Sequence, residues 1–570
     1  MRADSLAALG RWPAARSWPW YLAGALIYLS FGFTEMMGSD LWWHIAAGRE
    51  IVQSGSVWLV DDWSFTELGS PWRNHEWLAD LIFYAWVSLF GIPSLVLWKW
   101  LLIVGSFSLL QSVLERVSGS PAAAMLACAL AVAVAAPFMD MRPQLYTLLG
   151  IALLLRLALL RKPRLVELLP LFLCWANLHG GFVFGLMLLG ILRFPWRALS
   201  LAGLREALIT VLLCTAVCLL NPDGLRIFWL PLVYALDDSS PYRSIAEWRS
   251  PFEAGGIVSP LYLYTMVAAP ALILLWLLPT VRRSVPVLPE AIALALLTAA
   301  MSVTSRRFII LYAMGFALLL APFVGALLRQ RSFQLLALPL LAGALLWGTQ
   351  RLAPYPLRFD VAYHYLTAEY TYPEGLADFV EQNRLEGRTF AYYNWGGYLH
   401  WRGDGALQVF LDGRANTLFD DQTYLEYVSV LGGRPGWIGR VERSGAQLFL
   451  WPRSRGGAQL IRTLQGTGRW KTLYEDARGA LLAHESFALP LTLRFPSGNV
   501  AADLSEAYAA TRRGEAERAL AAASRAYAQR PWDQGACSWM RSALRARGRV
   551  ADGEQVTRDC REWFPSRYLR

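Results

Sequence analysis

Long apolar runs fill the first two-thirds of this sequence, and they constrain its fold more than any other feature. The chain has 570 residues, 55% of them hydrophobic. Its mixture of polar and apolar residues becomes that of an ordinary globular domain only from about residue 350. A helix of about 20 apolar residues crosses the roughly 30 Å hydrocarbon core of a bilayer. The runs are 19–36, 95–114, 121–139, 143–160, 165–177, 181–195, 206–220, 258–278, 286–303, 308–328 and 333–349. We therefore predict a mainly α fold in which residues 1–349 form a polytopic transmembrane helix bundle of about 11 spans.

Positive clusters between the runs predict the orientation, because Lys and Arg accumulate in cytoplasmic loops. The clusters are the N-terminal segment, Arg116, residues 161–164, the loop with Arg193, Arg197 and Arg205, the pair Arg282 and Arg283, and residues 329–331. The acidic loop 37–76 and the loop 238–257 are then expected outside. This arrangement requires that the short run 77–91 lies in the interface or re-enters. It gives a cytoplasmic N-terminus and an extracytoplasmic C-terminal part. Topology also accounts for the net charge of +10, so nucleic acid is not expected as a partner.

Residues 350–495 are predicted to form a small α/β domain outside the membrane. The segments TFAYYNWGGYLHW (389–401) and ALQVFLDGR (406–414) alternate or run apolar between turn residues, which is typical of strands. The segment PEGLADFVEQNRLEG (373–387) is typical of a helix with Pro near its start and Gly at its end. Interleaved helices and strands favour an α/β fold.

Residues 500–570 carry an internal period. Gly514 and Gly548 are separated by the same interval as Pro531 and Pro565. That interval of about 34 residues, with Gly between helices and Pro after them, is the tetratricopeptide (TPR) pattern. The region is therefore predicted to be TPR-like, packed on the α/β domain or on a protein partner. Cys537 and Cys560 fall on facing helices, either as a disulfide, if the tail lies outside, or as two buried thiols.

The first outer loop holds most of the candidate chemical groups. Asp40 and His44 are spaced i, i+4 and share one face of an expected interfacial helix. A carboxylate there can deprotonate an acceptor hydroxyl or hold a divalent cation. The alternative is an interfacial helix in which Asp40 is only a cap. Further polar residues of this loop are candidates for substrate binding, although acids are also common in solvated turns: Asp61, Asp62, His75 and Glu76.

Ionisable residues at the outer ends of later spans form a second candidate set, because charge beside lipid is costly and is usually retained for function. Asp140 and Arg142 lie in MDMRPQ, and His179 lies in ANLHGG. Arg306 and Arg307 stand at an outer end, against the positive-inside bias. Arginine matches phosphate oxygens, although it also snorkels to lipid headgroups. Acids near an arginine pair at one membrane face favour transfer chemistry on a phosphate-linked lipid.

The layout resembles the C-type glycosyltransferase (GT-C) superfamily over residues 19–349. The resemblance lies in one span followed by a long outer loop with an early Asp on an amphipathic helix. A set of motifs resembles more closely a group of uncharacterised bacterial membrane proteins placed beside that superfamily. They are DLWWHIAAG (40–48), HEWLAD (75–80), MRPQ (141–144), WANLHGGF (175–182), SRRF (305–308), NWGGYL (394–399) and VFLDGR (409–414). The segment WGG (395–397) is also typical of a tight packed turn. Asp412 and Arg414 are also typical of a local ion pair.

The resemblance implies a function. In the superfamily the first-loop acid is a catalytic base or metal ligand, which falls on Asp40, and an outer-face arginine contacts the donor phosphate, which falls on Arg306 or Arg307. It implies a glycosyltransferase in the bacterial inner membrane that moves a sugar from a polyprenyl-phosphate donor to a protein, lipid or glycan acceptor. A divalent cation, Mg²⁺ or Mn²⁺, is open as a cofactor. The alternatives are a non-catalytic scaffold for envelope polysaccharide assembly and a transporter of lipid-linked sugars.

Overall fold

The chain forms two compact units, each assembled from two separate stretches of sequence. The computed structural model describes residues 17–36, 38–161, 163–229, 240–253, 260–330, 335–353, 355 and 363–563. Unit 1 combines residues 1–34 with 97–353, and unit 2 combines residues 35–96 with 354–570. The first outer loop, assigned from the sequence to the membrane domain, is thus grouped with the C-terminal part. The predicted cytoplasmic N-terminal segment (1–16) falls outside the described residues, as do residues 238, 239 and 254–257 of the outer loop 238–257.

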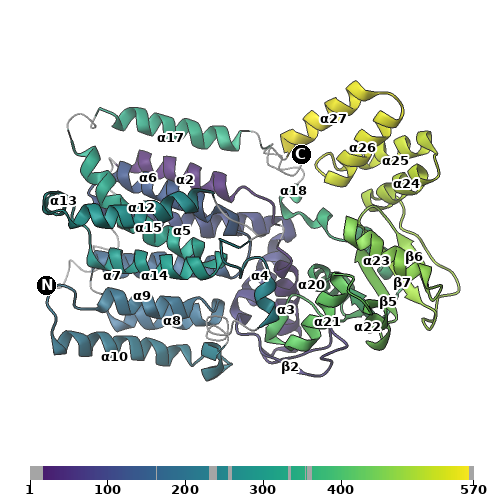
Figure 1. Cartoon of the computed structure of the whole chain (residues 1–570), viewed down its shortest axis with the longest axis horizontal. Helices are drawn as coiled ribbons and strands as arrows, with labels where there is room; N and C mark the ends of the chain where they lie inside the picture. Colours follow the sequence, from purple (N-terminus) through teal and green to yellow (C-terminus); the bar gives the residue numbers. More distant parts are fainter. Residues whose placement is uncertain are drawn as a thin grey trace. The chain divides into compact units, whose positions relative to one another are not determined.

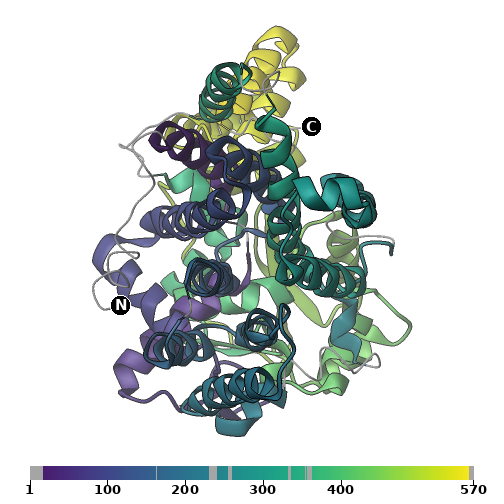
Figure 2. The same ribbon diagram turned by 90° about the vertical axis from the view of Figure 1, so that its left-hand side faces the viewer.

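Unit 1 is a bundle of helices whose axes are roughly aligned, seen from the side in Figure 1 and nearly end-on in Figure 2. Each of the apolar runs in the sequence coincides with one helix. These helices are α2 (Trp18–Gly32), α5 (Leu95–Ser118), α6 (Pro121–Ala135), α7 (Gln144–Leu160), α8 (Leu165–Leu178), α9 (Phe182–Arg193), α10 (Leu201–Cys218), α12 (Pro260–Leu277), α14 (Pro289–Thr304), α15 (Ile309–Leu328) and α17 (Ala337–Leu352).

Small side chains let the central helices of this bundle approach closely. Helix α15 is buried over most of its length and packs on the alanine-rich α6 and on α14. At Gly315 of α15 a side chain would meet Thr298 of α14. Such contacts between small residues are a common way for membrane helices to associate.

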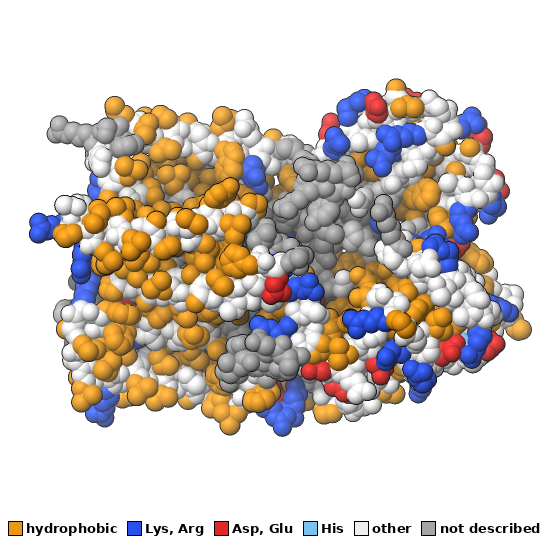
Figure 3. Space-filling model, viewed as in Figure 1, with side chains coloured by type: hydrophobic (Ala, Val, Ile, Leu, Met, Phe, Trp, Pro, Cys, Tyr) orange, Lys and Arg blue, Asp and Glu red, His pale blue; other side chains and the backbone are white. Residues whose placement is uncertain are grey.

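The outer surface of unit 1 is apolar. Leu261, Leu263, Val267 and Leu274 of α12 are exposed, and Figure 3 shows hydrophobic side chains covering the face over this helix. In the part of the chain that is described, five helices are long and apolar enough to cross a membrane. Five shorter apolar helices accompany them, of which one (Trp77–Phe90) belongs to unit 2. An exposed surface of this kind is suited to lipid. The unit is membrane-embedded, and the count of about 11 spans stays a prediction.

Unit 2 contains a five-stranded mixed sheet with the strand order β4-β3-β5-β7-β6. Strand β3 pairs in parallel with β4 and β5, and β7 pairs antiparallel with β5 and β6. The strands are β3 (Gly387–Ala391), β4 (Leu407–Val409), β5 (Leu448–Pro452), β6 (Trp470–Glu475) and β7 (Gly479–His484). The helices between and beside them are α19 (Glu374–Gln382), α20 (Gly396–Gly403), α21 (Asp421–Leu431), α22 (Trp437–Arg443) and α23 (Arg455–Gly466). Helix α19 and strand β4 lie where the sequence places a helix and a strand.

The predicted strand 389–401 is wrong beyond Ala391. Strand β3 ends there, and WGGYLHW begins helix α20 instead. The reason is a close helix contact. A side chain at Gly397 would come within 2.8 Å of the Cβ of Trp43, so only glycine allows α20 to pack here on α3. The glycine pair serves packing between helices, and the aromatic residues that resemble a strand bury themselves on one face of α20.

The first loop folds into helix α3 (Asp40–Ser54), the short hairpin of β1 (Leu59–Val60) and β2 (Pro71–Trp72), and helix α4 (Trp77–Phe90). Helices α3 and α4 pack on each other, and α3 also packs on α20. Trp43, Trp63 and Trp72 form the centre of a buried apolar cluster between these elements. The run 77–91, whose membrane placement the sequence leaves open, thus lies in unit 2 as a partner of α3.

Four helices form the C-terminal tail: α24 (Val500–Arg512), α25 (Ala516–Gln529), α26 (Gln534–Ala546) and α27 (Val550–Trp563). Helices α24 and α26 begin at residues 500 and 534, and α25 and α27 at 516 and 550, so each pair is offset by 34 residues. Gly514 and Gly548 occupy the intervening turns with positive φ. The assignment of this region to the TPR class stays a prediction.

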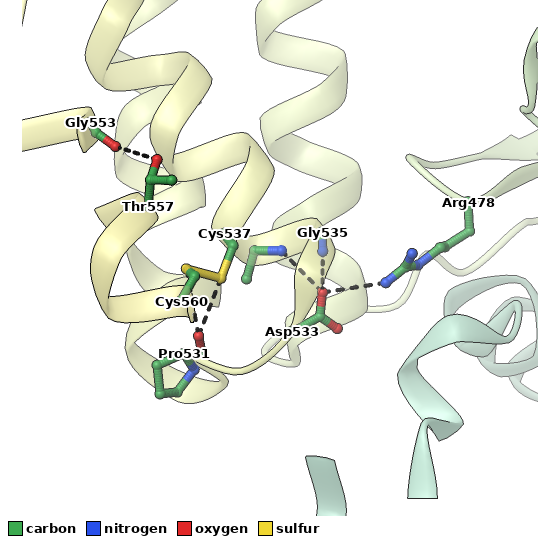
Figure 4. Close-up of a disulfide and its surroundings, with 9 residues drawn as sticks. Arg478, Pro531, Asp533, Gly535, Cys537, Gly553, Thr557 and Cys560 are labelled. Carbon is green, nitrogen blue, oxygen red and sulfur yellow. Dashed lines mark hydrogen bonds and ion pairs between the residues drawn. A yellow bond between two sulfur atoms is a disulfide. The ribbon is translucent and has the colours of Figure 1, made fainter. Parts of the chain in front are cut away.

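A disulfide joins Cys537 of α26 to Cys560 of α27, which decides between the two states left open by the sequence. Figure 4 shows it beside the loop that carries Pro531 and Asp533. Asp533 accepts hydrogen bonds from the backbone of Gly535 (2.6 Å) and Ala536 (3.0 Å) and pairs with Arg478 (3.3 Å) of the β6–β7 turn. This contact ties the tail to the sheet.

The β6–β7 turn contains a buried acid, Asp476. We predict from its carboxyl group that the stability of this turn depends on pH. Its carboxylate accepts hydrogen bonds from the backbone of Arg478 (2.8 Å) and Gly479 (3.0 Å). Burial raises the pKa of Asp476 to about 6. Because this folded-state pKa exceeds the ordinary value of about 3.9, the stability of this turn is complete below about pH 4 and is lost as pH rises through 6. The loss at pH 7 is about 3 kcal/mol.

We expect Asp476→Asn, which keeps an acceptor oxygen, to protect the β6–β7 amides from hydrogen exchange more than wild type does at pH 7. At pH 4 the two proteins should be equal. Replacing the exposed Asp404 with Asn in the same unit is the control and should change nothing. A difference between wild type and Asp476→Asn that does not vary with pH would contradict the prediction.

Candidate functional site

Helix α3 presents the principal candidate, Asp40, in its first turn. Asp40 is half-buried and accepts a hydrogen bond from the Ser39 hydroxyl at 3.3 Å. One turn further along, His44 is 2% exposed and lies with its Nδ1 2.5 Å from Asp80 Oδ1. The two residues of the predicted i, i+4 pair therefore differ in their surroundings: Asp40 is half-buried, whereas His44 is buried and paired with Asp80.

A network of polar groups surrounds His44. Asp80, fully buried on α4, also accepts a hydrogen bond from Asn74 Nδ2 at 2.5 Å. The Nε2 atom of His44 lies 4.0 Å from Glu76, and His75 lies 3.7 Å from the same carboxylate. Burial works to lower the pKa of His44, but the contact with Asp80 outweighs it and raises the pKa above its usual value. The network thus favours a charged imidazolium paired with a buried carboxylate.

Asp80 is absent from the candidate residues drawn from the sequence. It stands in the first turn of an apolar helix, in the HEWLAD motif, so an isolated acid followed by an apolar run is the signal that could have identified it. Such an acid needs a buried partner, and the partner is His44.

Asp61 is the centre of a second, closed cluster. Its carboxylate lies 2.6 Å from Arg414 Nη2, and Asp412 binds the same guanidinium at 2.8 Å. The side chain of Arg414 is fully buried and stacks over the rings of Trp63 (4.1 Å) and Trp72 (4.9 Å). The local ion pair expected between Asp412 and Arg414 is thus present and extends to the first loop. Asp61 is occupied in this cluster, which points to a structural role.

Asp62, the neighbour of Asp61, points elsewhere and is exposed. It lies with Glu50 and His400 in a group whose ligand atoms are all within 4.8 Å of one another. Of the described residues, this is the group whose arrangement could hold a metal ion. Glu50 and His400 are absent from the sequence-based candidates because about 350 residues separate them.

In unit 1 two of the outer-end residues, Arg142 and Arg307, lie beside Glu247, which the sequence did not single out. Arg142 binds both of its carboxylate oxygens, at 2.9 and 2.8 Å. Burial works to raise the pKa of Glu247, but Arg142 and then Arg307 outweigh it and hold that pKa below its usual value. Glu247 therefore stays ionised between two arginines.

The two arginines of SRRF have different surroundings. Arg306 is 2% exposed, and its guanidinium donates to the carbonyls of Ala246 (3.1 Å) and Glu253 (2.5 Å). The guanidinium of Arg307 stacks over the ring of Trp248 at 4.7 Å and is half-buried. Arg306 thus holds the loop before α12, and Arg307 has the more accessible head group.

The remaining candidates of unit 1 make local contacts. His179 Nδ1 lies 2.7 Å from the Thr147 hydroxyl, which also accepts a hydrogen bond from Trp175 Nε1 at 2.9 Å. Asp140 accepts a hydrogen bond from the backbone of Met141 at 2.8 Å. Asp40 belongs to unit 2 and the arginines to unit 1, so their position at one membrane face stays a prediction.

Comparison with known proteins supports the fold. No protein-family model and no curated protein matches the chain. Among solved structures, it is similar to the archaeal oligosaccharyltransferase AglB from Archaeoglobus fulgidus in complex with an inhibitory peptide and a dolichol-phosphate. The TM-score is 0.51 and the identity 10%, over 96% of this chain and 86% of that one.

A crystal structure of the Archaeoglobus fulgidus oligosaccharyltransferase, tethered to an acceptor peptide containing the NVT sequon, is also similar. It matches with a TM-score of 0.48 and 11% identity over 84% of this chain and 76% of that one. The chain therefore has the fold of this archaeal oligosaccharyltransferase, as the resemblance drawn from the sequence predicts.

Proposed function

We propose that this protein is a membrane glycosyltransferase that moves a sugar from a polyprenyl-phosphate-linked donor to an extracytoplasmic acceptor. The observation that carries the proposal is the half-buried Asp40 in the first turn of α3, in the first outer loop of a chain with the oligosaccharyltransferase fold. The similar AglB structure holds a dolichol-phosphate and a peptide, which supports a lipid-linked donor and a protein acceptor here. The helical tail is proposed to bind the acceptor or a protein partner.

In the proposed mechanism Asp40 accepts the proton of the acceptor hydroxyl or amide, or positions a divalent cation such as Mg²⁺ or Mn²⁺. The ion pair of His44 with Asp80 fixes the helix turn that follows Asp40. His75 and Glu76 line the same part of unit 2. Preorganised groups of this kind act mainly by stabilising charge that develops in the transition state.

For the donor phosphate we propose Arg307, with Arg142 and Glu247 positioning it. Its guanidinium is half-buried over Trp248, and it carries a fork suited to phosphate oxygens. Arg306 is bonded to backbone carbonyls, and therefore a structural role suits it better.

The proposed location is the bacterial inner membrane, with the N-terminus in the cytoplasm and unit 2 outside. The disulfide between Cys537 and Cys560 supports an outer position for the tail, because disulfides persist in oxidising compartments.

The test is a transfer assay in proteoliposomes with a short-chain polyprenyl-phosphate sugar and a peptide or glycan acceptor. We expect wild type to transfer the sugar and Arg307→Gln to lose about 10²–10³ in kcat, the usual cost of one charge-stabilising group. Arg164→Gln, which removes an exposed arginine, is the control and should keep full activity. Transfer by Arg307→Gln at the wild-type rate would exclude this role. If wild type transfers no sugar from any polyprenyl-phosphate donor, the proposed function is wrong.

A further inference from the structure

Three side chains from distant elements meet at one point of unit 2. Glu50 lies in the last turns of α3, Asp62 follows strand β1, and His400 lies in α20. The Nε2 atom of His400 is 2.7 Å from Glu50 Oε1, and the ligand atoms of all three residues lie within 4.8 Å of one another. Ligands of one bound cation, each about 2.0–2.2 Å from it, would be separated by distances of this order.

His400 has the properties of a metal ligand. It is 4% exposed and stacks on the ring of Trp63 with 3.9 Å between ring centroids, which fixes its orientation. Burial lowers the pKa of His400 to about 3, so the ring stays neutral and one nitrogen keeps its lone pair. Among the described residues, its Nδ1 has no hydrogen-bond partner. In the tautomer that leaves Nε2 free for a cation, the ring proton sits on Nδ1. Since no described residue is hydrogen-bonded to Nδ1, moving the proton there breaks no hydrogen bond at that atom.

The two carboxylates of this group lack a fixed positive partner. Arg414 nearby is held by Asp61 and Asp412, and Arg49 pairs with Asp404 at 3.0 Å. In the described part of the chain, no lysine or arginine forms an ion pair with Glu50 or Asp62.

The carboxylates are also held in surroundings that disfavour their charge. Burial raises the pKa of Glu50 to about 7, and burial and then Glu50 raise the pKa of Asp62. A divalent cation would remove this repulsion.

We propose that Glu50, Asp62 and His400 bind one divalent transition-metal ion, Mn²⁺ or Zn²⁺. One imidazole with two carboxylates suits these ions, and three protein ligands leave a position open to water. The exposed Asp62 gives the ion a path from solvent.

The site is distinct from any cation held at Asp40. Glu50 lies ten residues further along α3, which places it roughly 15 Å from Asp40 along the helix axis. A bound ion would fasten α3, the loop after β1 and α20 together, and the proposal does not depend on transfer activity.

The experiment is a calorimetric titration of metal-free, detergent-solubilised full-length protein, once with MnCl₂ and once with ZnCl₂. We expect wild type to bind one equivalent that Asp62→Asn and His400→Gln lose or bind more than about tenfold more weakly. Asp62 is exposed, so its variant should fold normally. Asp404→Asn removes a neighbouring carboxylate outside the group and should bind as wild type does. Asp40→Asn should retain this equivalent.

The result that overturns the proposal is equal stoichiometry and affinity for wild type and Asp62→Asn, in both titrations. Loss of the equivalent in Asp40→Asn with retention in Asp62→Asn would also overturn it, because the ion would then belong to Asp40. Thermal melting gives a second measurement. Zn²⁺ or Mn²⁺ should raise the melting temperature of wild type and of Asp404→Asn but not of Asp62→Asn, since an ion stabilises only the state that binds it.

Discussion

Asp40→Asn should reduce sugar transfer by about 10²–10⁴-fold, the range that a general base contributes. Asparagine has the same shape and can still accept the hydrogen bond from Ser39, but it cannot take a proton. The substitution also removes a negative charge from the first turn of α3, which costs only about 0.3–1 kcal/mol. Expression and stability should therefore stay close to those of wild type, and the loss should appear in kcat.

The matched control is Asp421→Asn, which removes an exposed acid from the first turn of α21 in the same unit. It should keep full activity with the same small change in stability. Both variants are compared in the proteoliposome assay at equal protein density. If Asp40→Asn transfers sugar at the wild-type rate, Asp40 is not the base. The scaffold alternative gains support if a variant with alanine in place of Asp40, Arg306 and Arg307 still rescues envelope assembly in cells.

Arg414→Met should destabilise unit 2 by about 3–5 kcal/mol, the usual cost of breaking a buried ion pair. The guanidinium, Asp61 and Asp412 have at most 1% of their side-chain surface exposed. Methionine fills similar space but leaves two carboxylates buried without a cation. Arg414→Lys should also destabilise the unit, because an ammonium cannot reproduce the two-sided contact of the fork.

The design isolates the charge from the packing. The triple variant with Asp61→Asn, Asp412→Asn and Arg414→Met buries no charge and should recover much of the lost stability. Arg549→Met, which removes an exposed ion pair with Asp552, should leave stability unchanged. Unfolding is followed by amide hydrogen exchange in the segments that carry Trp63 and Trp72, which stack on Arg414. If Arg414→Met alone is as stable as wild type, the prediction is wrong.

Local patterns in the sequence predict much of the fold. Every apolar run became a helix, since a run of this length in lipid can satisfy its backbone only as a helix. Helix α19 and strand β4 also lie where the pattern puts them. The failure at 392–403 arose because the glycine pair serves a contact with Trp43, which is distant in the sequence.

The candidate site was predictable only in part, for the same reason. Asp40 and His44 are neighbours on one helix, so their spacing is visible in the chain. The partners Asp80 and Glu247 are not, because burial and ion pairing depend on tertiary contacts. The ion pair of Asp61 is equally invisible in the chain, because its partner Arg414 lies about 350 positions away.

The composition of unit 2 from residues 35–96 and 354–570 has a consequence for its biosynthesis. The early segment leaves the ribosome first, and its partner follows only after the intervening 257 residues (97–353) have been made. At about 5–20 residues per second this interval lasts roughly 13–50 s. Throughout that time the tryptophans of α3 and the β1–β2 hairpin have no α20 to cover them. A nascent chain that stops near residue 353 would therefore present an uncovered aromatic surface, and quality-control proteases would have a clear mark of incomplete synthesis.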